Sequence, residues 1–256
     1  MVEMYENKNT LEKTFDYDFL SGDLQQAQRA EFIELKKIIK ELSDKNGHPI
    51  SILDIGIGNA RIPKLLFEIK EIWNNVEKYD GIDNSKNCIQ IAKKVINDLK
   101  LQDKVSIKYL DAVNLDNLDQ KYDLIILTWF TAGNFYPDKF PFENYSKKIY
   151  LKENKKFDTI FKNAYNLLKF GGEIVIGSCY IDNESTRKKQ ENFYKKCGMK
   201  IITDNKESFT ATKEGFWSQR FTKDKIRNYL NWISPKKISF FNLDTYNYAM
   251  LVRIKK

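Results

Sequence analysis

The fold of this 256-residue chain is decided by the stretch Leu53-Asp54-Ile55-Gly56-Ile57-Gly58-Asn59-Ala60. It continues a short apolar strand, expected over residues 51–55, and precedes a helix expected over residues 62–70. Glycine between a strand and a helix lets the backbone bend sharply and approach a ligand closely. The stretch therefore predicts a ligand-binding loop at the carboxyl end of a strand, with a plain strand-to-helix turn as the alternative.

Strands and helices alternate on both sides of this loop. Apolar and alternating runs predict further strands at residues 78–83, 105–109, 122–129, 173–178, 237–243 and 246–254. Apolar residues at helical spacing predict helices at residues 31–43, 86–100, 156–169, 185–196 and 223–232. This alternation is typical of a doubly wound α/β fold. We therefore expect a mostly parallel seven-stranded sheet with an antiparallel edge strand and helices on both faces.

The segments outside this pattern predict how the chain is divided. Residues 1–45 are expected to form an N-terminal helical cap, and residues 46–256 are expected to form the α/β domain. Two insertions are expected over the ligand site, at about residues 130–150 and 185–221, and the second should contain a hairpin within residues 200–220.

Two charged residues beside the loop indicate which kind of ligand it binds. A dinucleotide loop carries a third glycine where this sequence has Arg61, whose side chain hinders close packing of the helix. Asp54 precedes Gly56 by two residues and places an anion beside the loop. An anion repels a pyrophosphate but attracts ammonium and sulfonium groups. The loop therefore favours a ligand with cationic groups over NAD or ATP.

Three further polar positions follow the next strands of the predicted sheet. Asp83 ends the second strand, where a carboxylate can accept hydrogen bonds from both hydroxyls of a ribose. Asp111 and Ala112 follow the third strand, where they could contact an adenine edge, and Thr128 and Trp129 end the fourth, where the reactive end of the ligand is expected. Simpler roles stay open, since Asp83 could cap the following helix and Asp111 could be an ordinary turn residue.

These positions together resemble the class I methyltransferase family, whose methyl donor is S-adenosylmethionine. Residues 54–60 look like its acidic-x-Gly-x-Gly-x-Gly loop, with Ala60 in place of the last glycine, and residues 169–172 resemble the turn before its fifth strand. The resemblance covers about residues 30–180 and implies a Rossmann-like fold and the product S-adenosylhomocysteine. The donor-binding residues that it implies are Asp54, Gly56, Gly58, Asn59, Asp83, Asn84, Asp111, Ala112, Thr128 and Trp129.

Composition argues against several other classes of protein. The chain has a single histidine, His48, and three widely spaced cysteines, so no metal site is expected. No apolar run approaches the roughly 18 residues of a membrane span, and the first ten residues lack an apolar signal core, so a cytoplasmic protein is expected. The formal charge of +8 comes mostly from scattered lysines, since only six of the 43 basic residues are arginine. That pattern favours a solvated surface over a nucleic-acid site.

The residues that follow the fourth strand exclude some methyl acceptors. Enzymes that methylate exocyclic amines of nucleobases carry an Asn/Asp-Pro-Pro-aromatic motif there, whereas residues 128–135 of this chain contain no proline. Cytosine-C5 methyltransferases need a Pro-Cys pair at the same place, so Cys179 after the fifth strand is expected to be a buried structural thiol. A small molecule or a peptide remains as the acceptor. N-methylation is favoured over O-methylation because no histidine is placed to act as a base. The alternatives are an RNA- or protein-modifying methyltransferase and a non-catalytic protein that binds the donor.

The two insertions supply the candidates for acceptor binding. Aromatic residues after the fourth strand could wall a dry pocket, and Arg220 in the second insertion could bind a carboxylate. The predicted substrate-binding residues are Phe130, Phe135, Tyr136, Trp217 and Arg220. The catalytic candidates are Trp129, Asn134 and the cap residue Tyr17, and an amine or hydroxyl could also be oriented by Asp138 or Glu143. A purely structural role stays open for each of them.

Overall fold

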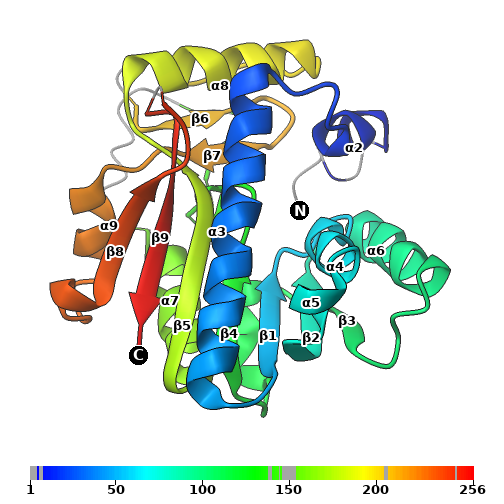
Figure 1. The fold of residues 1–256 in the computed structure, drawn as a ribbon. Helices are drawn as coiled ribbons and strands as arrows, with labels where there is room; N and C mark the ends of the chain where they lie inside the picture. Colours follow the sequence, from blue (N-terminus) through cyan, green and yellow to red (C-terminus); the bar gives the residue numbers. More distant parts are fainter. Residues whose placement is uncertain are drawn as a thin grey trace.

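The computed structural model describes residue 5 and residues 8–137, 140–143, 145, 154–204, 207–245 and 247–256. Its centre is a seven-stranded sheet with the strand order β3-β2-β1-β4-β5-β9-β8 (Figure 1). The strands are β1 (Ile50–Ile55), β2 (Val76–Asp83), β3 (Val105–Tyr109), β4 (Tyr122–Leu127), β5 (Leu168–Tyr180), β8 (Ile238–Asn242) and β9 (Ala249–Lys255). Strands β1 to β5 pair in parallel, whereas β9 pairs antiparallel with both β5 and β8. The predicted doubly wound, mostly parallel fold is confirmed, and its antiparallel strand lies next to the edge strand β8.

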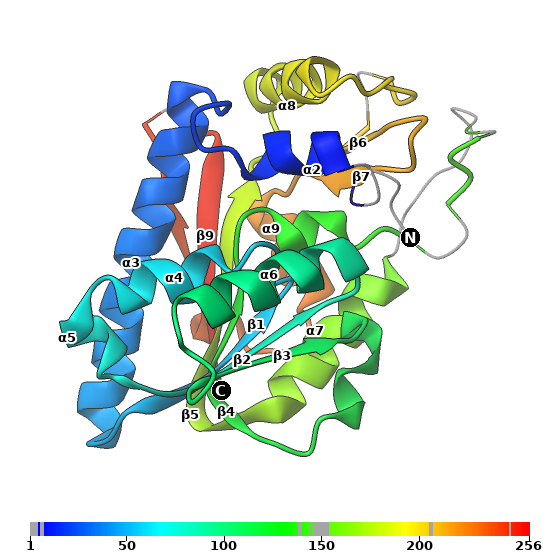
Figure 2. The same cartoon turned by 90° about the vertical axis from the view of Figure 1, so that its right-hand side faces the viewer.

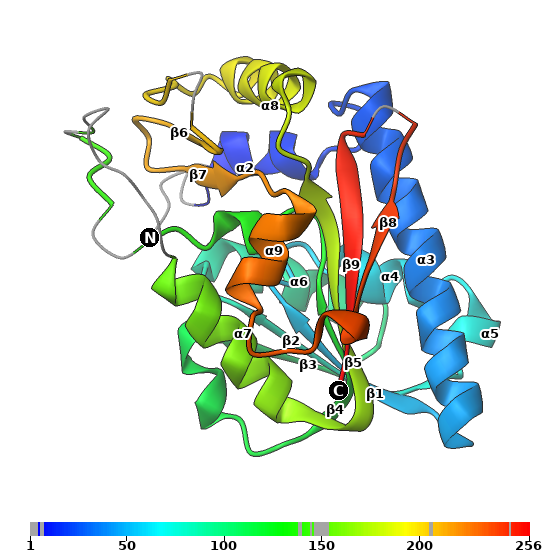
Figure 3. The same cartoon turned by 90° about the vertical axis from the view of Figure 1, so that its left-hand side faces the viewer.

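Helices cover both faces of the sheet, as predicted. Helices α3, α4 and α6 pack on one face (Figure 2), and α7 and α9 pack on the other (Figure 3). The helices are α2 (Lys8–Phe15), α3 (Gly22–Asn46), α4 (Arg61–Phe67), α5 (Lys70–Trp73), α6 (Lys86–Asp98), α7 (Lys155–Leu167), α8 (Glu184–Lys196) and α9 (Lys223–Tyr229). The 3-10 helices in the described part of the chain are η1 (Ala112–Asn117), η2 (Thr131–Asn134) and η3 (Pro235–Lys237).

The core consists of two layers that the strands supply by alternation. In β1, Ile52 packs into the layer under α3 while its neighbour Leu53 packs into the layer under α7. In β4, Leu124 packs into the layer under α3 and Ile125 packs into the layer under α7. Successive side chains of a strand point to opposite faces, so a strand covered on both faces is apolar throughout. This explains why β1 and β4 are buried along their whole length.

Helix α3 is longer than the predicted helix at residues 31–43. Its buried stripe begins earlier, with Leu24 and Ala27, so the helix starts at Gly22. It ends at Asn46 rather than at residue 43, where Gly47 takes the left-handed conformation and its N–H bonds to the carbonyl of Ser43 at 2.9 Å. Part of the stretch expected to fold over the ligand site therefore belongs to a helix that runs along the sheet (Figure 1).

The strands that border the ligand site end differently from the prediction. Strand β4 stops at Leu127 rather than at Trp129, because Trp129 and Phe130 have φ angles of 50° and 63°, which an extended strand does not allow. Helix α7 ends at Leu167 rather than residue 169, and β5 starts directly after it. Within β5, a Cβ atom on Gly172 would lie 2.9 Å from the carbonyl oxygen of Asp123, so glycine is needed there for space.

Above the carboxyl ends of the central strands lie α2, α8 and a hairpin of β6 (Phe209–Ala211) and β7 (Trp217–Gln219), as Figure 1 shows. The hairpin is shorter than the predicted 200–220 segment. Much of the first insertion, including Asp138, lies outside the described residues. The division of the chain at residue 45 stays a prediction. Among the described residues, no helix is long and apolar enough to cross a membrane, and no cluster of His, Cys, Asp and Glu could hold a metal ion.

Candidate active site

A cavity opens at the carboxyl ends of β1 to β4, where the sequence predicted a ligand site. We call it the strand-end cavity. The residues that directly follow each of these strands contribute to its wall, because parallel strands end at the same edge of a sheet. The predicted donor-binding residues that line it are Gly56, Gly58, Asn59, Asp83, Asn84, Asp111, Ala112, Thr128 and Trp129.

The glycine loop needs its first two glycines for conformation and space. Gly56 and Gly58 have φ angles of 79° and 57°, and a Cβ atom on Gly56 would lie only 2.6 Å from Cγ2 of Thr131. Ala60 also takes the left-handed conformation, with φ of 59°. Glycine adopts that conformation without the steric cost that a Cβ atom brings. The departure from the family motif at this position therefore places a mildly strained residue at the start of α4.

Asp83 connects the glycine loop to the start of α6. Its Oδ2 accepts the N–H of Gly58 at 3.0 Å, and its Oδ1 accepts the N–H of Ser85 at 2.8 Å. Ser85, not Asp83, is the N-cap of α6, since its hydroxyl accepts the N–H of Cys88. Burial raises the pKa of Asp83 above its ordinary value. A carboxylate oxygen can accept more than one hydrogen bond, so both oxygens keep capacity toward the cavity.

Asp54 lies beneath the loop rather than in the cavity wall. It is 1% exposed, and its Oδ2 accepts the hydroxyl proton of Tyr79 at 2.6 Å. Burial raises the pKa of Asp54 to about 7. Its second oxygen is buried and has no hydrogen-bond partner in the part of the chain that the structure describes. Asp54 therefore does not line the cavity, and its predicted part in donor binding stays a prediction.

Asp111 is the N-cap of the 3-10 helix η1 and lines the cavity where β3 ends. Its Oδ1 accepts the N–H of Val113 at 3.1 Å, which is the geometry of an N-cap. Its Oδ2 lies 3.5 Å from Nδ2 of Asn84 and 3.9 Å from Nζ of Lys156. The turn role that the sequence left open is therefore present, and the same side chain also lines the cavity.

A second, smaller cavity joins the first, and aromatic rings form most of its wall. We call it the aromatic chamber. Its wall shares five residues with the strand-end cavity: Tyr5, Thr14, Phe15, Trp129 and Asn134. Its other residues are Leu24, Phe130, Tyr180, Phe193, Tyr194 and Phe216, which come from α3, β5, α8, the turn before β7 and the loop after β4. Elements from both insertions and from the N-terminal segment therefore enclose one space beside the glycine loop.

Asn134 stands at the wall that the two cavities share. Its Nδ2 donates to the hydroxyl of Tyr5 at 3.2 Å. Its Oδ1 is buried and accepts no hydrogen bond from any described residue. A buried carbonyl oxygen without a donor costs about 1–3 kcal/mol, so this atom is a strong candidate to bind a ligand N–H.

A comparison of the chain with protein-family models decides its family. The model described as a methyltransferase domain matches residues 47–231, which is most of the chain. The chain belongs to this methyltransferase family. The predicted family is confirmed, and with it S-adenosylmethionine as the methyl donor.

Several solved structures with a similar fold are methyltransferases as well. The CcbJ methyltransferase from Streptomyces caelestis superposes with a TM-score of 0.58 at 11% identity, over 93% of each chain. An S-adenosylmethionine-dependent methyltransferase from Clostridium acetobutylicum gives a TM-score of 0.55 at 14% identity, over 88% of this chain and 91% of the other. A 1,6-didemethyltoxoflavin-N1-methyltransferase from Burkholderia thailandensis, with 1,6-didemethyltoxoflavin and S-adenosylhomocysteine bound, gives 0.51 at 13% identity, over 91% and 81%. No curated protein matches the chain in sequence.

The wall of the strand-end cavity suits the donor of this methyltransferase. The nucleoside carries hydroxyl and amino hydrogens, and Asp83 and Asp111 offer carboxylate oxygens at the ends of β2 and β3. The amino-acid part carries an ammonium group, for which the buried Asp54 supplies negative potential. The predicted donor-binding residues other than Asp54 therefore line one cavity, and donor binding by each of them stays a prediction.

The predicted acceptor residues of the methyltransferase divide into two groups. Phe130 lines the aromatic chamber, and Phe135 and Tyr136 line the strand-end cavity. Trp217 and Tyr17 line neither cavity. The Trp217 ring stacks on that of Phe209, with centroids 5.2 Å apart, and the Tyr17 ring packs against the core layer under α3. Their predicted contacts with acceptor or donor stay predictions. Glu143 is exposed.

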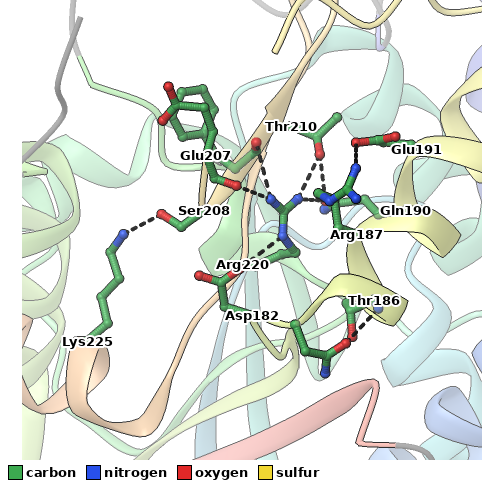
Figure 4. Close-up of polar contacts among 12 residues, drawn as sticks. Asp182, Thr186, Arg187, Gln190, Glu191, Glu207, Ser208, Thr210, Arg220 and Lys225 are labelled. Atoms are coloured by element: carbon green, nitrogen blue, oxygen red, sulfur yellow. Dashed lines mark hydrogen bonds and ion pairs between the residues drawn. The ribbon is translucent and has the colours of Figure 1, made fainter. Parts of the chain in front are cut away.

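Arg220 also lies outside both cavities, in a buried network that Figure 4 shows. Its Nε donates to Asp182 at 3.2 Å, and its Nη1 donates to Gln190 at 2.6 Å and to Thr210 at 2.8 Å. Its Nη2 donates to the carbonyl of Glu207. Because every guanidinium nitrogen has a partner, Arg220 joins the hairpin to α8 and to the segment after β5. The predicted contact with an acceptor carboxylate stays a prediction, while the observed contacts are structural.

Sequence reasoning missed several residues that enclose the two cavities. They are Tyr5, Phe15, Tyr180, Phe193, Tyr194 and Phe216. None belongs to a motif, and an isolated aromatic residue gives no sign of which wall it joins. The position of Tyr180 could have been found, because it ends the fifth strand beside Thr128 and Trp129 after the fourth.

Proposed function

We propose that this methyltransferase methylates a nitrogen atom of a small, largely apolar acceptor that binds in the aromatic chamber. The observation that carries the proposal is the wall shared by the chamber and the strand-end cavity, which includes Trp129 and Asn134. When bound, S-adenosylmethionine supplies an already activated methyl group. Aromatic rings beside the donor site hold an apolar acceptor and keep water out, and catalysis then rests mainly on positioning.

The composition of the chamber wall supports a nitrogen acceptor. Among the described residues that form it, none is a histidine or an acid. An oxygen acceptor becomes a good nucleophile only when a base takes its proton. A neutral amine already carries the lone pair that attacks the methyl carbon. The bond from that carbon to sulfur would break as the N–C bond forms, and the methylated amine can lose its proton to solvent when it leaves the chamber. A chamber without a base therefore suits an amine better than an alcohol.

The side-chain oxygen of Asn134, unpaired among the described residues, also supports a nitrogen acceptor. Its buried Oδ1 can accept an N–H of the acceptor, which satisfies this oxygen and directs the nitrogen lone pair toward the strand-end cavity. We therefore assign Asn134 as the residue that orients the acceptor, and Phe130 as part of the wall that holds its apolar body.

The N-terminal segment forms part of the wall of both cavities. Tyr5, Thr14 and Phe15 line both cavities, and Leu24 of α3 lines the chamber. Access for an acceptor therefore depends on these residues. We propose that residues 1–45 form the cap over residues 46–256 and limit the acceptor to a small molecule or a side chain of a peptide.

Methyl transfer to matched pairs of compounds tests the proposal. Purified protein is incubated with S-adenosylmethionine that carries a CD3 group and with aromatic amines and the phenols of the same ring, and products are identified by mass spectrometry. We expect labelled amines and unlabelled phenols. Asn134→Leu should lower kcat/KM for the amine about 10- to 100-fold with unchanged affinity for S-adenosylhomocysteine. Asn74→Leu, at an exposed asparagine, is the control. Labelled phenols without labelled amines would refute the nitrogen acceptor.

A nucleic-acid acceptor is the second candidate, and the formal charge of +8 favours it. Binding to phosphates releases counterions, so it weakens steeply as salt is added, whereas binding of a neutral amine does not. Methylation of total RNA that disappears between 50 and 200 mM salt, together with no product from the amine panel, would replace the small-molecule proposal.

A further inference from the structure

Arg61 is the first residue of α4 and lies directly after the glycine loop. Its Nη2 forms an ion pair of 2.7 Å with Oε2 of Glu31, which is 1% exposed and belongs to α3. The guanidinium also lies over the ring of Trp129, with its carbon 5.8 Å from the ring centroid. The side chain that breaks the dinucleotide motif is therefore held in one position by Glu31 of α3 and by Trp129.

Glu31 is itself tightly fixed. Its Oε1 accepts the N–H of Trp129 at 2.8 Å, so each oxygen of the carboxylate has a partner. Gly177 of β5 lies so close that a Cβ atom there would be 2.2 Å from the same Oε1. A carboxylate with this little freedom leaves the guanidinium of Arg61 little freedom as well.

The other terminal nitrogen of Arg61 faces a different environment. Its Nη1 is buried and donates to no acceptor in the described part of the chain, although Arg61 lines the strand-end cavity. A buried N–H of a cation without an acceptor is costly. A ligand in the cavity that carries an anionic oxygen would remove this cost.

The sheet order tells which end of the cavity Arg61 occupies. Asp83 and Asp111 follow β2 and β3, on one side of β1. Arg61 contacts Trp129, which follows β4, and it pairs with Glu31, which packs against β5. These contacts lie on the other side of β1. The two carboxylates and the contacts of the guanidinium therefore lie on opposite sides of β1.

We propose that Nη1 of Arg61 binds the α-carboxylate of the donor, with Glu31 as the residue that positions the guanidinium. This inference rests on the proposed function of the cavity as the donor site. Of the groups of S-adenosylmethionine, the carboxylate is the anionic one. A guanidinium binds a carboxylate by a charge-assisted hydrogen bond, which is stronger than a neutral one.

Two ligands that differ by the amino-acid part test this proposal without any methyl transfer. S-Adenosylhomocysteine and 5′-methylthioadenosine are both nucleoside thioethers, but only the first carries the carboxylate. Isothermal titration measures the affinity of each for the wild type, Arg61→Met, Arg61→Lys and the control Lys64→Met. Lys64 is an exposed basic residue on the same helix. Thermal melting of each variant shows that it folds.

We expect Arg61→Met to lower the affinity for S-adenosylhomocysteine about 10- to 100-fold and the affinity for 5′-methylthioadenosine less than threefold. Arg61→Lys should lie between the wild type and Arg61→Met, and Lys64→Met should match the wild type. An equal loss for both ligands would mean that Arg61 shapes the loop, and no loss would mean that it contacts neither. Both results would overturn the inference. A wild type that binds neither ligand would instead overturn the donor site itself.

Discussion

Phe130 stacks on Tyr180, with ring centroids 3.6 Å apart and an angle of 3° between the ring planes. Tyr180 ends β5, and Phe130 follows the neighbouring strand β4 by three residues. The stack therefore bridges two adjacent strand ends at the place where the chamber meets the sheet. Both rings line the chamber, and neither lines the strand-end cavity. The acceptor and the donor thus have walls that can be altered separately.

Replacing Tyr180 with leucine should weaken acceptor binding and leave donor binding unchanged. Leucine fills much of the same volume but removes the ring that holds Phe130 in place. We expect kcat/KM for the acceptor to fall about 3- to 10-fold, mainly through KM, with the affinity for S-adenosylhomocysteine unchanged. Tyr180→Phe keeps the stack and should behave as the wild type. Equal losses in both variants would show that the hydroxyl, rather than the stack, matters.

Replacing Asp83 with alanine should weaken donor binding rather than acceptor binding. The change removes the acceptor that the ribose hydroxyls would use and leaves the N–H groups of Gly58 and Ser85 without their partner. We expect the affinity for S-adenosylhomocysteine to fall about 10- to 100-fold by isothermal titration. Asp158→Ala, at a surface carboxylate paired with Lys162, is the matched control and should change nothing. Unchanged affinity in Asp83→Ala would mean that the ribose binds elsewhere.

The sheet and one end of the site could be predicted because local patterns determine them. The glycine loop, Asp83 and Asp111 each follow an apolar run, and the alternation of strands and helices forces their carboxyl ends to the same edge. Burial on both faces makes the central strands continuously apolar, which is a strong signal in sequence. The ends of the strands are harder to predict. Trp129 and Phe130 take the left-handed conformation and end β4 early, and the sequence does not indicate this conformation at either residue.

The acceptor end could not be predicted to the same degree. Tyr180, Tyr194 and Phe216 reach one chamber from three separate elements, and only tertiary packing decides which aromatic residue faces a cavity. Arg220 illustrates the converse problem. Its charge and its place in an insertion suggested a ligand contact, yet its nitrogens are occupied by partners from α8, the hairpin and the segment after β5. A sequence shows the charge of a side chain but not its hydrogen-bond partners.

Asp54 should make the folded protein less stable as the pH rises. In the unfolded chain it ionises near its ordinary pKa of 3.8, whereas in the folded protein burial raises its pKa to about 7. The folded state thus binds the proton more tightly, so the stability linked to this proton is full below about pH 4 and is lost as the pH rises to about 7. Asp54→Asn removes the titration and keeps an acceptor for Tyr79.

Urea denaturation of the wild type and of Asp54→Asn at pH 4.5 and pH 8 measures this effect. We expect the wild type to lose stability relative to the variant on going from pH 4.5 to 8, by on the order of 3 kcal/mol. Other groups titrate equally in both proteins and cancel in the difference. A difference that does not vary with pH would contradict the raised pKa of Asp54.

Arg220 should be a determinant of stability, and a conservative change should reveal it. Lysine keeps the charge but cannot supply donors in the directions of Asp182, Gln190 and Thr210 together. We expect Arg220→Lys to lower the free energy of unfolding by about 2–4 kcal/mol, measured in urea. Arg227→Lys is the matched control, because Arg227 also pairs with an aspartate, Asp224, but at the surface. It should cost less than about 0.5 kcal/mol. Equal effects would mean that the buried network contributes no more than a surface pair.

The close approach of Gly177 to Glu31 predicts that substitutions at these two positions affect stability jointly. Gly177→Ala places a methyl group 2.2 Å from an oxygen of Glu31, which cannot turn away without losing the N–H of Trp129 and the guanidinium of Arg61. We expect this variant to lose about 1–3 kcal/mol of unfolding free energy in urea. Gly22→Ala, at a glycine with nothing within 4 Å of the added atom, is the control and should be neutral.

The double variant separates this clash from other effects of the methyl group. Glu31→Ala alone destabilises, because it leaves Arg61 without its carboxylate partner. With Glu31 already removed, however, the methyl group at residue 177 meets no side chain there, so Gly177→Ala should add little further loss. The two substitutions should therefore be non-additive by at least about 1 kcal/mol in a double-mutant cycle. Additive losses would show that the alanine at residue 177 strains the backbone of β5 and that Glu31 is not confined by the strand beneath it.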